Sequence, residues 1–184
     1  MDILCRTDDL VVLNKPPGVS LLSDRSGVEC LWDRLPELLG QKPYLVHRLD
    51  KPTSGVLLIA LNQSTQRKLT RLFQQRRVRK FYLGWVAGQP PARGHIDLPL
   101  KKGRKSRFRI AGQRADIAEQ DGVWSLPRHE TEPDPLGHDS QTRFRVLLRH
   151  DDRSLLLLQP LTGRTHQLRV HLSWIGYPLI GDAL

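Results

Sequence analysis

The sequence predicts an α+β fold built on a mixed sheet. Short runs rich in leucine and β-branched residues, each bounded by turn residues, alternate irregularly with a few helical patterns. Two of these runs are separated only by a tight polar turn, which is typical of a hairpin. The length of 184 residues suits a single domain that buries roughly two-thirds of its unfolded surface.

The first part of the chain contains two expected strands and one weak helix. Residues 8–14 form a strand pattern that ends at the turn cluster Lys15-Pro16-Pro17-Gly18. Leucines near helical spacing over 28–40 predict a helix that Pro36 interrupts. Residues 56–61 then predict a buried strand.

A strongly basic helix is expected next, over residues 64–77, with Ser64 as its N-cap. Residues 82–86 and 107–110 follow as strand patterns. The helix has an apolar face, formed by Leu69, Leu72 and Phe73, and a basic face, formed by Arg67, Lys68, Arg71, Arg76 and Arg77.

The last part of the chain predicts a hairpin followed by a helix. Residues 142–150 alternate as a strand does, and the acids in the turn at 151–153 are interpreted as turn residues leading into a strand at 154–161. Apolar residues at helical spacing predict a helix over 166–175, which Gly176 ends.

The formal charge of +10 and the pI near 10.2 point to an acidic partner, most simply nucleic acid. Residues 64–114 hold 15 Lys and Arg and one acid, Asp97. Residues 115–139 hold seven acids and one Arg, among prolines and glycine, and are interpreted as a flexible acidic insertion. A merely solvated basic surface is the alternative for the first segment, but its excess of cations favours phosphate contact.

Composition and missing motifs narrow the function classes. Only two cysteines are present, without CxxC, which excludes a disulfide scaffold and favours a reduced, cytoplasmic setting. No apolar run has the ~20 residues of a membrane helix. The nucleotide motifs GxxxxGK[ST] and GxGxxG are absent. His166 and His171 are five positions apart, which suits joint metal ligation poorly, so no metal site is expected.

Two segments carry polar residues that a purely structural element does not require. HRLDKPTSG, residues 47–55, places one carboxylate between cations just before a strand, and LTGRTHQLRVHL, residues 161–172, sets polar residues between apolar ones. The structural alternatives are a turn opened by Asp50 with solvated neighbours, and an amphipathic helix whose polar face lies in water.

Taken with VVLNKPPG (residues 11–18) and KFYLGWVAG (residues 80–88), these segments resemble the RluA family of RNA pseudouridine synthases. The four motifs occur in family order over nearly the whole chain. The resemblance implies the pseudouridine synthase fold, a mixed, largely antiparallel sheet with helices and a central catalytic cleft. It also implies conversion of particular RNA uridines to pseudouridine by base flipping, without cofactor or metal.

The resemblance implies a role for each matching residue. Asp50 matches the catalytic aspartate, Tyr82 the tyrosine that stacks on the target base, and Arg169 the basic residue paired with the aspartate. Arg48 matches an arginine that fills the space left by the flipped uridine. The remaining expected contacts to RNA and to the flipped base come from Thr53, Arg164, His166 and Gln167. Independently of the resemblance, the basic segment at 64–114 predicts phosphate contacts from Arg67, Arg71, Arg76 and Arg77.

We therefore expect a single catalytic domain over residues 1–184, without an S4-type RNA-binding domain, that acts as a monomer on a stem-loop of ribosomal or transfer RNA. Two features depart from the family pattern: the chain ends at Leu184, and the acidic insertion at 115–139 is long. Two rival functions stay open. One is a non-catalytic RNA-binding protein with this fold, and the other is a glycosylase that excises a flipped base.

Overall fold

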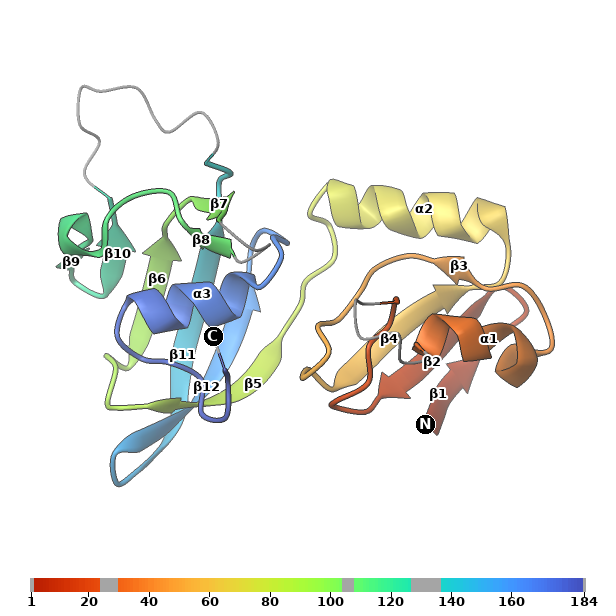
Figure 1. Cartoon of the computed structure of the whole chain (residues 1–184), viewed down its shortest axis with the longest axis horizontal. Coiled ribbons are helices and arrows are strands. Elements are labelled where there is room, and N and C mark those ends of the chain that lie inside the picture. The colour runs from red at the N-terminus through yellow and green to blue at the C-terminus, as the bar shows by residue number, and fades with distance from the viewer. Residues whose placement is uncertain (1, 24–29, 104–107, 127–136, 184) are drawn as a thin grey trace. The chain divides into compact units, whose positions relative to one another are not determined.

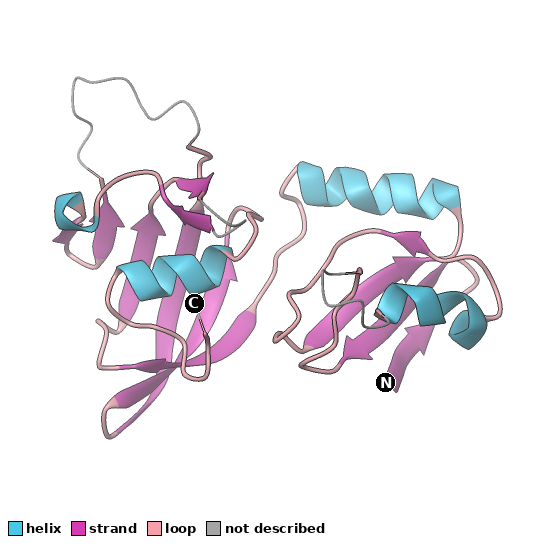
Figure 2. Ribbon diagram, viewed as in Figure 1, coloured by secondary structure: helices cyan, strands magenta, loops and turns pink. Residues whose placement is uncertain are grey.

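The structure is a computed structural model that describes residues 2–23, 30–103, 108–126 and 137–183. The chain divides into two compact units, Met1–Val78 and Arg79–Leu184, and each unit is described by itself (Figure 1). The expected α+β class is confirmed, because helices accompany sheets that are largely antiparallel (Figure 2). The single catalytic domain expected from the length stays a prediction.

The first unit contains a four-stranded antiparallel sheet in the order β1-β2-β4-β3. Its strands are β1 (Asp2–Arg6), β2 (Leu10–Lys15), β3 (Tyr44–Leu45) and β4 (Gly55–Ala60). Alternate residues of β2 and β4 point into the core, which confirms both expected strands. The buried residues of this core are Val11, Leu13, Leu21, Leu31, Leu35, Leu39, Leu57, Ile59 and Leu61.

Helix α1 spans Leu31–Leu39 and contains Pro36 without a break, so the expected interruption is wrong. A proline removes one N–H but leaves the helical φ available, and α1 buries Leu35 completely against the sheet. Gly40 ends the helix in the left-handed conformation, with φ at 69°.

Helix α2 spans Gln63–Gln74, and its N-cap is Asn62 rather than the expected Ser64. The Asn62 side chain accepts a hydrogen bond from the Thr65 N–H at 2.8 Å. Because Asn62 keeps an extended backbone while Ser64 is already helical, only Asn62 is placed to cap the first turn.

The second unit contains a six-stranded sheet in the order β5-β12-β11-β6-β10-β9. All of its described pairs are antiparallel except β10 with β6. Its strands are β5 (Tyr82–Ala87), β6 (Arg93–Asp97), β9 (Ala118–Gln120), β10 (Val123–Ser125), β11 (Gln141–His150) and β12 (Arg153–Pro160), beside a separate β7 (Leu100–Lys102) and β8 (Phe108–Ile110) pair.

Helix α3 (Gln167–Trp174) lies across one face of this sheet, as Figure 2 shows. Val170 and Leu172 are buried in the same core as the inward residues of the strands. That core also contains Val86, Ile96, Leu98, Leu100, Ile110, Trp124, Phe144, Leu156 and Leu158.

The hairpin between β11 and β12 is confirmed, and Asp151 takes a left-handed turn conformation with φ at 49°.

Part of the acidic segment at 115–139 differs from the expected irregular structure. Strands β9 and β10 lie within it and join the six-stranded sheet, because Trp124 buries its ring against Phe144. Residues 127–136 of that segment lie outside the described residues, as does Arg107 of the strand expected at 107–110.

Candidate functional site

The HRLD segment forms the connection between β3 and β4 in the first unit. The Asp50 carbonyl accepts the Thr53 N–H at 3.0 Å, which closes a turn. Leu49 is buried, whereas Arg48 is exposed and Asp50 and Thr53 are half-buried. The buried leucine therefore anchors the turn and leaves the neighbouring polar side chains of Arg48 and Asp50 at its surface.

A buried lysine, Lys15, ties this turn to the end of β2. Its ammonium Nζ donates to the carbonyls of Pro16 at 2.8 Å, Val19 at 2.9 Å and Lys51 at 3.3 Å. Burial lowers the pKa of Lys15, and the negative charge of Asp50 partly opposes that shift. From the sequence, Lys15 was expected only as part of a turn. Its anchoring role was missed because its three acceptors are backbone carbonyls, which leave no pattern in the sequence.

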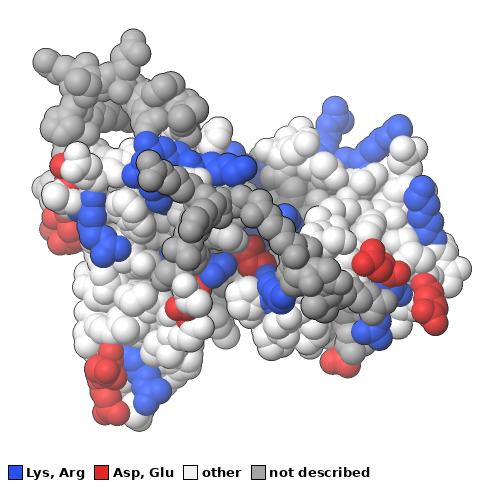
Figure 3. All heavy atoms as spheres, viewed as in Figure 1, with Lys and Arg blue, Asp and Glu red and all other residues white. Residues whose placement is uncertain are grey.

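The side chain of His47 fixes the same turn against β4 and α2. Its Nε2 accepts the Leu58 N–H at 3.0 Å, and its ring stacks on Phe73 with the centroids 4.8 Å apart. The outer side of α2 and the residues after it are exposed and basic, and Figure 3 shows Lys and Arg gathered over α2. This exposed set contains all the expected phosphate contacts: Arg67, Arg71, Arg76 and Arg77.

Tyr82 begins β5 in the second unit and is half-buried. It pairs with Leu158 of β12, and it packs against the core that α3 covers. Two residues earlier, the Lys80 ammonium donates to the Thr162 carbonyl at 3.0 Å. The start of the tyrosine strand is therefore bonded to the loop that leads into α3.

The loop before α3 carries the next expected residues. Arg164 is exposed, and its Nε donates to the Asp139 carbonyl at 3.0 Å. His166 is the N-cap of α3 in a left-handed conformation, with φ at 56°, and its ring meets that of Phe108 edge-on at 6.0 Å. Gln167 is buried at the first position of the helix.

Arg169 makes a two-pronged ion pair with Asp182. Its Nε donates to Asp182 Oδ2 at 2.8 Å, and its Nη2 donates to Oδ1 at 2.6 Å. The two side chains are only 16% and 12% exposed. With Gln167 and His171 buried on the same helix, the alternative of a polar face in water is wrong. Asp182 was not among the partners expected for Arg169 from the sequence.

The structure thus assembles the expected residues in two groups, one in each unit. Arg48, Asp50 and Thr53 share one turn of the first unit. In the second unit, Tyr82 lies on the strand and Arg169 on the helix that the Lys80–Thr162 bond connects. The pairing of Asp50 with Arg169 involves both units and stays a prediction.

His171 uses both ring nitrogens inside the second unit. Its Nδ1 lies 3.0 Å from Thr142 Oγ1 and its Nε2 lies 2.9 Å from the Leu98 carbonyl. Burial lowers the pKa of His171 to about 4, so the ring is neutral at physiological pH. Within the described ranges, no group of three His, Cys, Asp or Glu side chains is placed to hold a metal ion, and no helix there is long and apolar enough to cross a membrane.

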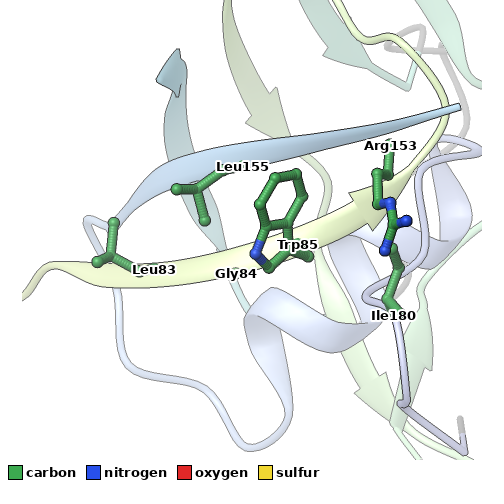
Figure 4. A pocket seen from close by; sticks show the side chains of 6 residues that line it. All are labelled: Leu83, Gly84, Trp85, Arg153, Leu155 and Ile180. Carbon is green, nitrogen blue, oxygen red and sulfur yellow. The ribbon is translucent and has the colours of Figure 1, made fainter. Parts of the chain in front are cut away.

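A pocket of about 420 Å³ lies along β5 and β12 (Figure 4). Leu83 and Trp85, which alternate with Tyr82 along the strand, form part of its lining with Leu155 and Ile180. Arg153 is the one ionisable side chain among its lining residues. Because alternate residues of a strand point to opposite faces, this pocket is not on the face that Tyr82 occupies.

Comparison with known proteins identifies the family of this chain. Residues 9–174 match the model of the RNA pseudouridylate synthase family. The chain belongs to that family.

Individual relatives agree with this assignment. The chain is 39% identical to an RNA pseudouridine synthase of Chloroflexus aurantiacus over 158 residues, which cover 84% of this chain and 43% of the relative. It is 35% identical to tRNA pseudouridine synthase C of Haemophilus ducreyi, over 99% of this chain and 72% of that protein. It is also 35% identical to the dual-specificity RNA pseudouridine synthase RluA of Escherichia coli, over 98% of this chain and 74% of that protein.

A solved structure, human RNA pseudouridylate synthase domain containing 4, matches with a TM-score of 0.79 and 31% identity. The match covers 98% of this chain and 67% of the human one. The expected pseudouridine synthase fold is therefore confirmed. The chain spans less than half the length of the Chloroflexus relative and about two-thirds to three-quarters of the other proteins named here.

Proposed function

We propose that this protein is an RNA pseudouridine synthase that isomerises specific uridines to pseudouridine in a stem-loop of ribosomal or transfer RNA. The observation that carries the proposal is the family match over residues 9–174, which includes both polar segments, HRLD and GRTHQLR. Among the relatives named above, one is named for transfer RNA and another for dual specificity.

The reaction detaches uracil from ribose at N1 and rejoins it through C5, so it requires access to the base, a nucleophile and containment. A stacked uridine must first leave the helix, at an energy of a few kcal/mol. The exposed guanidinium of Arg48 would fill the gap and offset part of that energy. Asp50, in the same turn, would then act as the nucleophile and divide one difficult step into two easier ones.

The remaining roles follow from the chemistry of each side chain. The Tyr82 ring provides a flat surface for the uracil, and its hydroxyl is suited to moving the C5 proton. Arg169 would hold the Asp50 carboxylate ionised, since an opposite charge within ~4–6 Å lowers a carboxylate pKa. The exposed cations on and after α2 would contact phosphates without regard to sequence. We further propose that the protein works as a monomer in the cytoplasm.

Tritium release tests the function directly. When tritium replaces the hydrogen at C5 of uridine, the isomerisation expels the label, because C5 forms the new bond to ribose. RNA labelled at C5 should lose tritium to water with the wild-type protein and keep it with Asp50→Asn, which preserves shape but removes the nucleophile. Asp50→Asn should still bind the same RNA. Turnover by Asp50→Asn within about tenfold of wild type would contradict the assignment, since loss of a nucleophile typically removes far more.

Tritium release, together with a search for free uracil among the products, separates the rival functions. A non-catalytic RNA-binding protein would release no tritium, and a glycosylase would release free uracil. Because no cofactor or metal is proposed, excess chelator should leave tritium release unchanged on an RNA that folds without divalent ions. Mapping pseudouridine in RNA treated with the protein would then identify the modified uridine.

A further inference from the structure

Four polar side chains are buried beneath the GRTHQ loop of the second unit. Thr142, Thr162, Gln167 and His171 are each at most 4% exposed. A buried polar group without a hydrogen bond destabilises a fold, so the partners of these four side chains matter. These four side chains form one continuous chain of hydrogen bonds.

The chain begins at His171, where the surroundings fix the tautomer. The Leu98 carbonyl can only accept, so Nε2 of His171 carries the proton across their 2.9 Å contact. In a neutral ring Nδ1 is then an acceptor, and its partner at 3.0 Å is the Thr142 hydroxyl. The Thr142 proton therefore points toward His171.

Gln167 continues the chain from Thr142. Its Nε2 donates to Thr142 Oγ1 at 3.0 Å and to the Gln141 carbonyl at 2.9 Å. Since the Gln141 carbonyl only accepts, this contact assigns the amide orientation of Gln167. Its Oε1 must then accept, and both of its partners lie in the loop before α3.

Those two partners are the Thr162 hydroxyl, at 2.7 Å, and the Arg164 N–H, at 3.0 Å. The Thr162 oxygen in turn accepts the Gln141 N–H at 3.0 Å. The Thr162 carbonyl accepts the Lys80 ammonium, two residues before Tyr82. Thr162 is therefore the junction between the tyrosine strand and the loop that leads into α3.

We propose that Gln167 and His171 are positioning residues of the isomerisation. Their hydrogen bonds hold the loop of Arg164 and the helix of Arg169 in one orientation against the strand of Tyr82. This inference rests on the proposed function, and it assigns to Gln167 a role inside the protein in place of the RNA contact expected from its motif.

A purely structural role of Gln167 and His171 would lead to a different result. If these side chains only fill the core, replacements of equal volume change stability alone. If they position the site, activity depends on the direction of each hydrogen bond, because a displacement of about 1 Å in a reacting group lowers a rate by up to about a hundredfold. Thr142 offers a matched pair: Val keeps its shape and loses the hydroxyl, whereas Ser keeps the hydroxyl.

The experiment measures single-turnover pseudouridine formation with enzyme in excess, on the RNA that the wild-type protein modifies. Thr142→Val and Gln167→Met should lower the rate by about tenfold or more. Affinity for the RNA should change less than about threefold, since neither side chain is exposed to it. Thr142→Ser should return the rate to within about threefold of wild type.

Ser154→Ala is the control, because Ser154 is a buried hydroxyl of the same unit that donates to the Gly88 carbonyl at 3.0 Å, outside this network. It should change the rate less than about twofold at equal or larger loss of thermal stability. Rates of Thr142→Val and Gln167→Met that match the control would overturn the proposal.

A second measurement needs no variant. Nitrogen-15 NMR of the wild-type protein at pH 8 should show His171 with its proton on Nε2 and a bare Nδ1. A proton on Nδ1 at that pH would overturn the proposal, whatever the variants do. A wild-type protein that forms no pseudouridine would overturn the proposed function, whereas the tautomer would still report the network.

Discussion

The turn that carries Asp50 and the loop that carries Arg164 are both irregular backbone, yet they are held in different ways. In the first unit a single buried ammonium, Lys15, gathers three carbonyls around itself. In the second unit, neutral side chains around Gln167 and His171 hold the loop through bonds of fixed direction.

The two anchors respond differently to distortion. An ammonium is a point charge on a flexible stem with three equivalent donors, so it tolerates small shifts of its acceptors. An amide and an imidazole each have one arrangement that satisfies every neighbour, so a shift breaks a specific bond. We infer that the Asp50 turn adjusts more readily when RNA enters, whereas the arginine loop keeps its geometry.

The largest effect is expected at Arg169, which belongs to the rigid side of this comparison. Arg169→Ala leaves the Asp182 carboxylate, 12% exposed, without its two-pronged partner, so stability should fall by about 3 kcal/mol. Activity should fall with it if Arg169 also serves Asp50. Arg169→Lys restores the charge but not the planar geometry and should recover activity only in part.

Asp182→Ala separates the two roles of Arg169. It removes the same ion pair and leaves the guanidinium in place, so it should lower the melting temperature about as much as Arg169→Ala but reduce tritium release less. Equal losses of activity in both variants would show that Arg169 acts only through Asp182, and the predicted pair with Asp50 would be wrong. A stability change below ~0.5 kcal/mol in Arg169→Ala would contradict the buried ion pair.

A smaller effect is expected from Lys15→Met, which tests the flexible side. Methionine fills a similar volume but removes the ammonium that donates to the carbonyls of Pro16, Val19 and Lys51, so stability should fall by about 2 kcal/mol. Hydrogen exchange followed by mass spectrometry should show faster exchange at residues 50–53 and unchanged exchange in α3. Protection that stays equal to wild type at 50–53 would show that Lys15 does not anchor the turn.

The loss of folding stability at low pH should reveal the neutral His171 ring. The pKa of His171 in the folded protein, about 4, lies below its ordinary value of about 6.5, so the unfolded chain binds the proton first as pH falls. The stability that the neutral ring contributes is full above pH 6.5 and is lost toward pH 4, by about 2 kcal/mol at pH 5. Urea unfolding at pH 7 and pH 5 measures this loss, and His171→Gln should reduce it. An identical loss in His171→Gln would assign the acid response to other groups.

The smallest effect concerns the exposed cations at the end of α2. Reversing Arg71, Arg76 and Arg77 to Glu should flatten the dependence of RNA affinity on salt, because each phosphate contact contributes a slope of about 0.7–0.9. Reversing Arg34, Arg143 and Arg145, which lie outside the basic segment at 64–114, provides a control of equal charge. A slope that changes equally in both variants would show that net charge, not this surface, decides binding.

Much of this architecture was predictable because periodicity and turn residues determine it locally. The hairpin at 151–153, the strand before α2 and the helix after GRT all follow from short patterns. The misplaced cap at Ser64 shows the limit, since Ser and Asn two positions apart are equally good candidates until the backbone decides. Pro36 was misjudged because the packing of α1 outweighs the local cost of a proline in a helix.

The candidate site was predictable in its residue types but not in its supports. Asp182, Thr142 and Lys15 were missed because their partners are distant in sequence or are backbone carbonyls, which leave no pattern in the chain. The strands at 118–125 were missed for a related reason: they are short and polar, and a single tryptophan makes them part of the sheet.

The left-handed backbone at His166 affects how this position should be read when relatives are compared. A backbone φ of 56° is tolerated by glycine, asparagine and a few other residues, whereas valine or isoleucine would be strained there, whatever the RNA requires. Glycine or asparagine at the equivalent position of a relative would therefore indicate only that the backbone conformation is kept. Histidine at that position, where glycine is less strained, would instead indicate that the imidazole is needed for the chemistry.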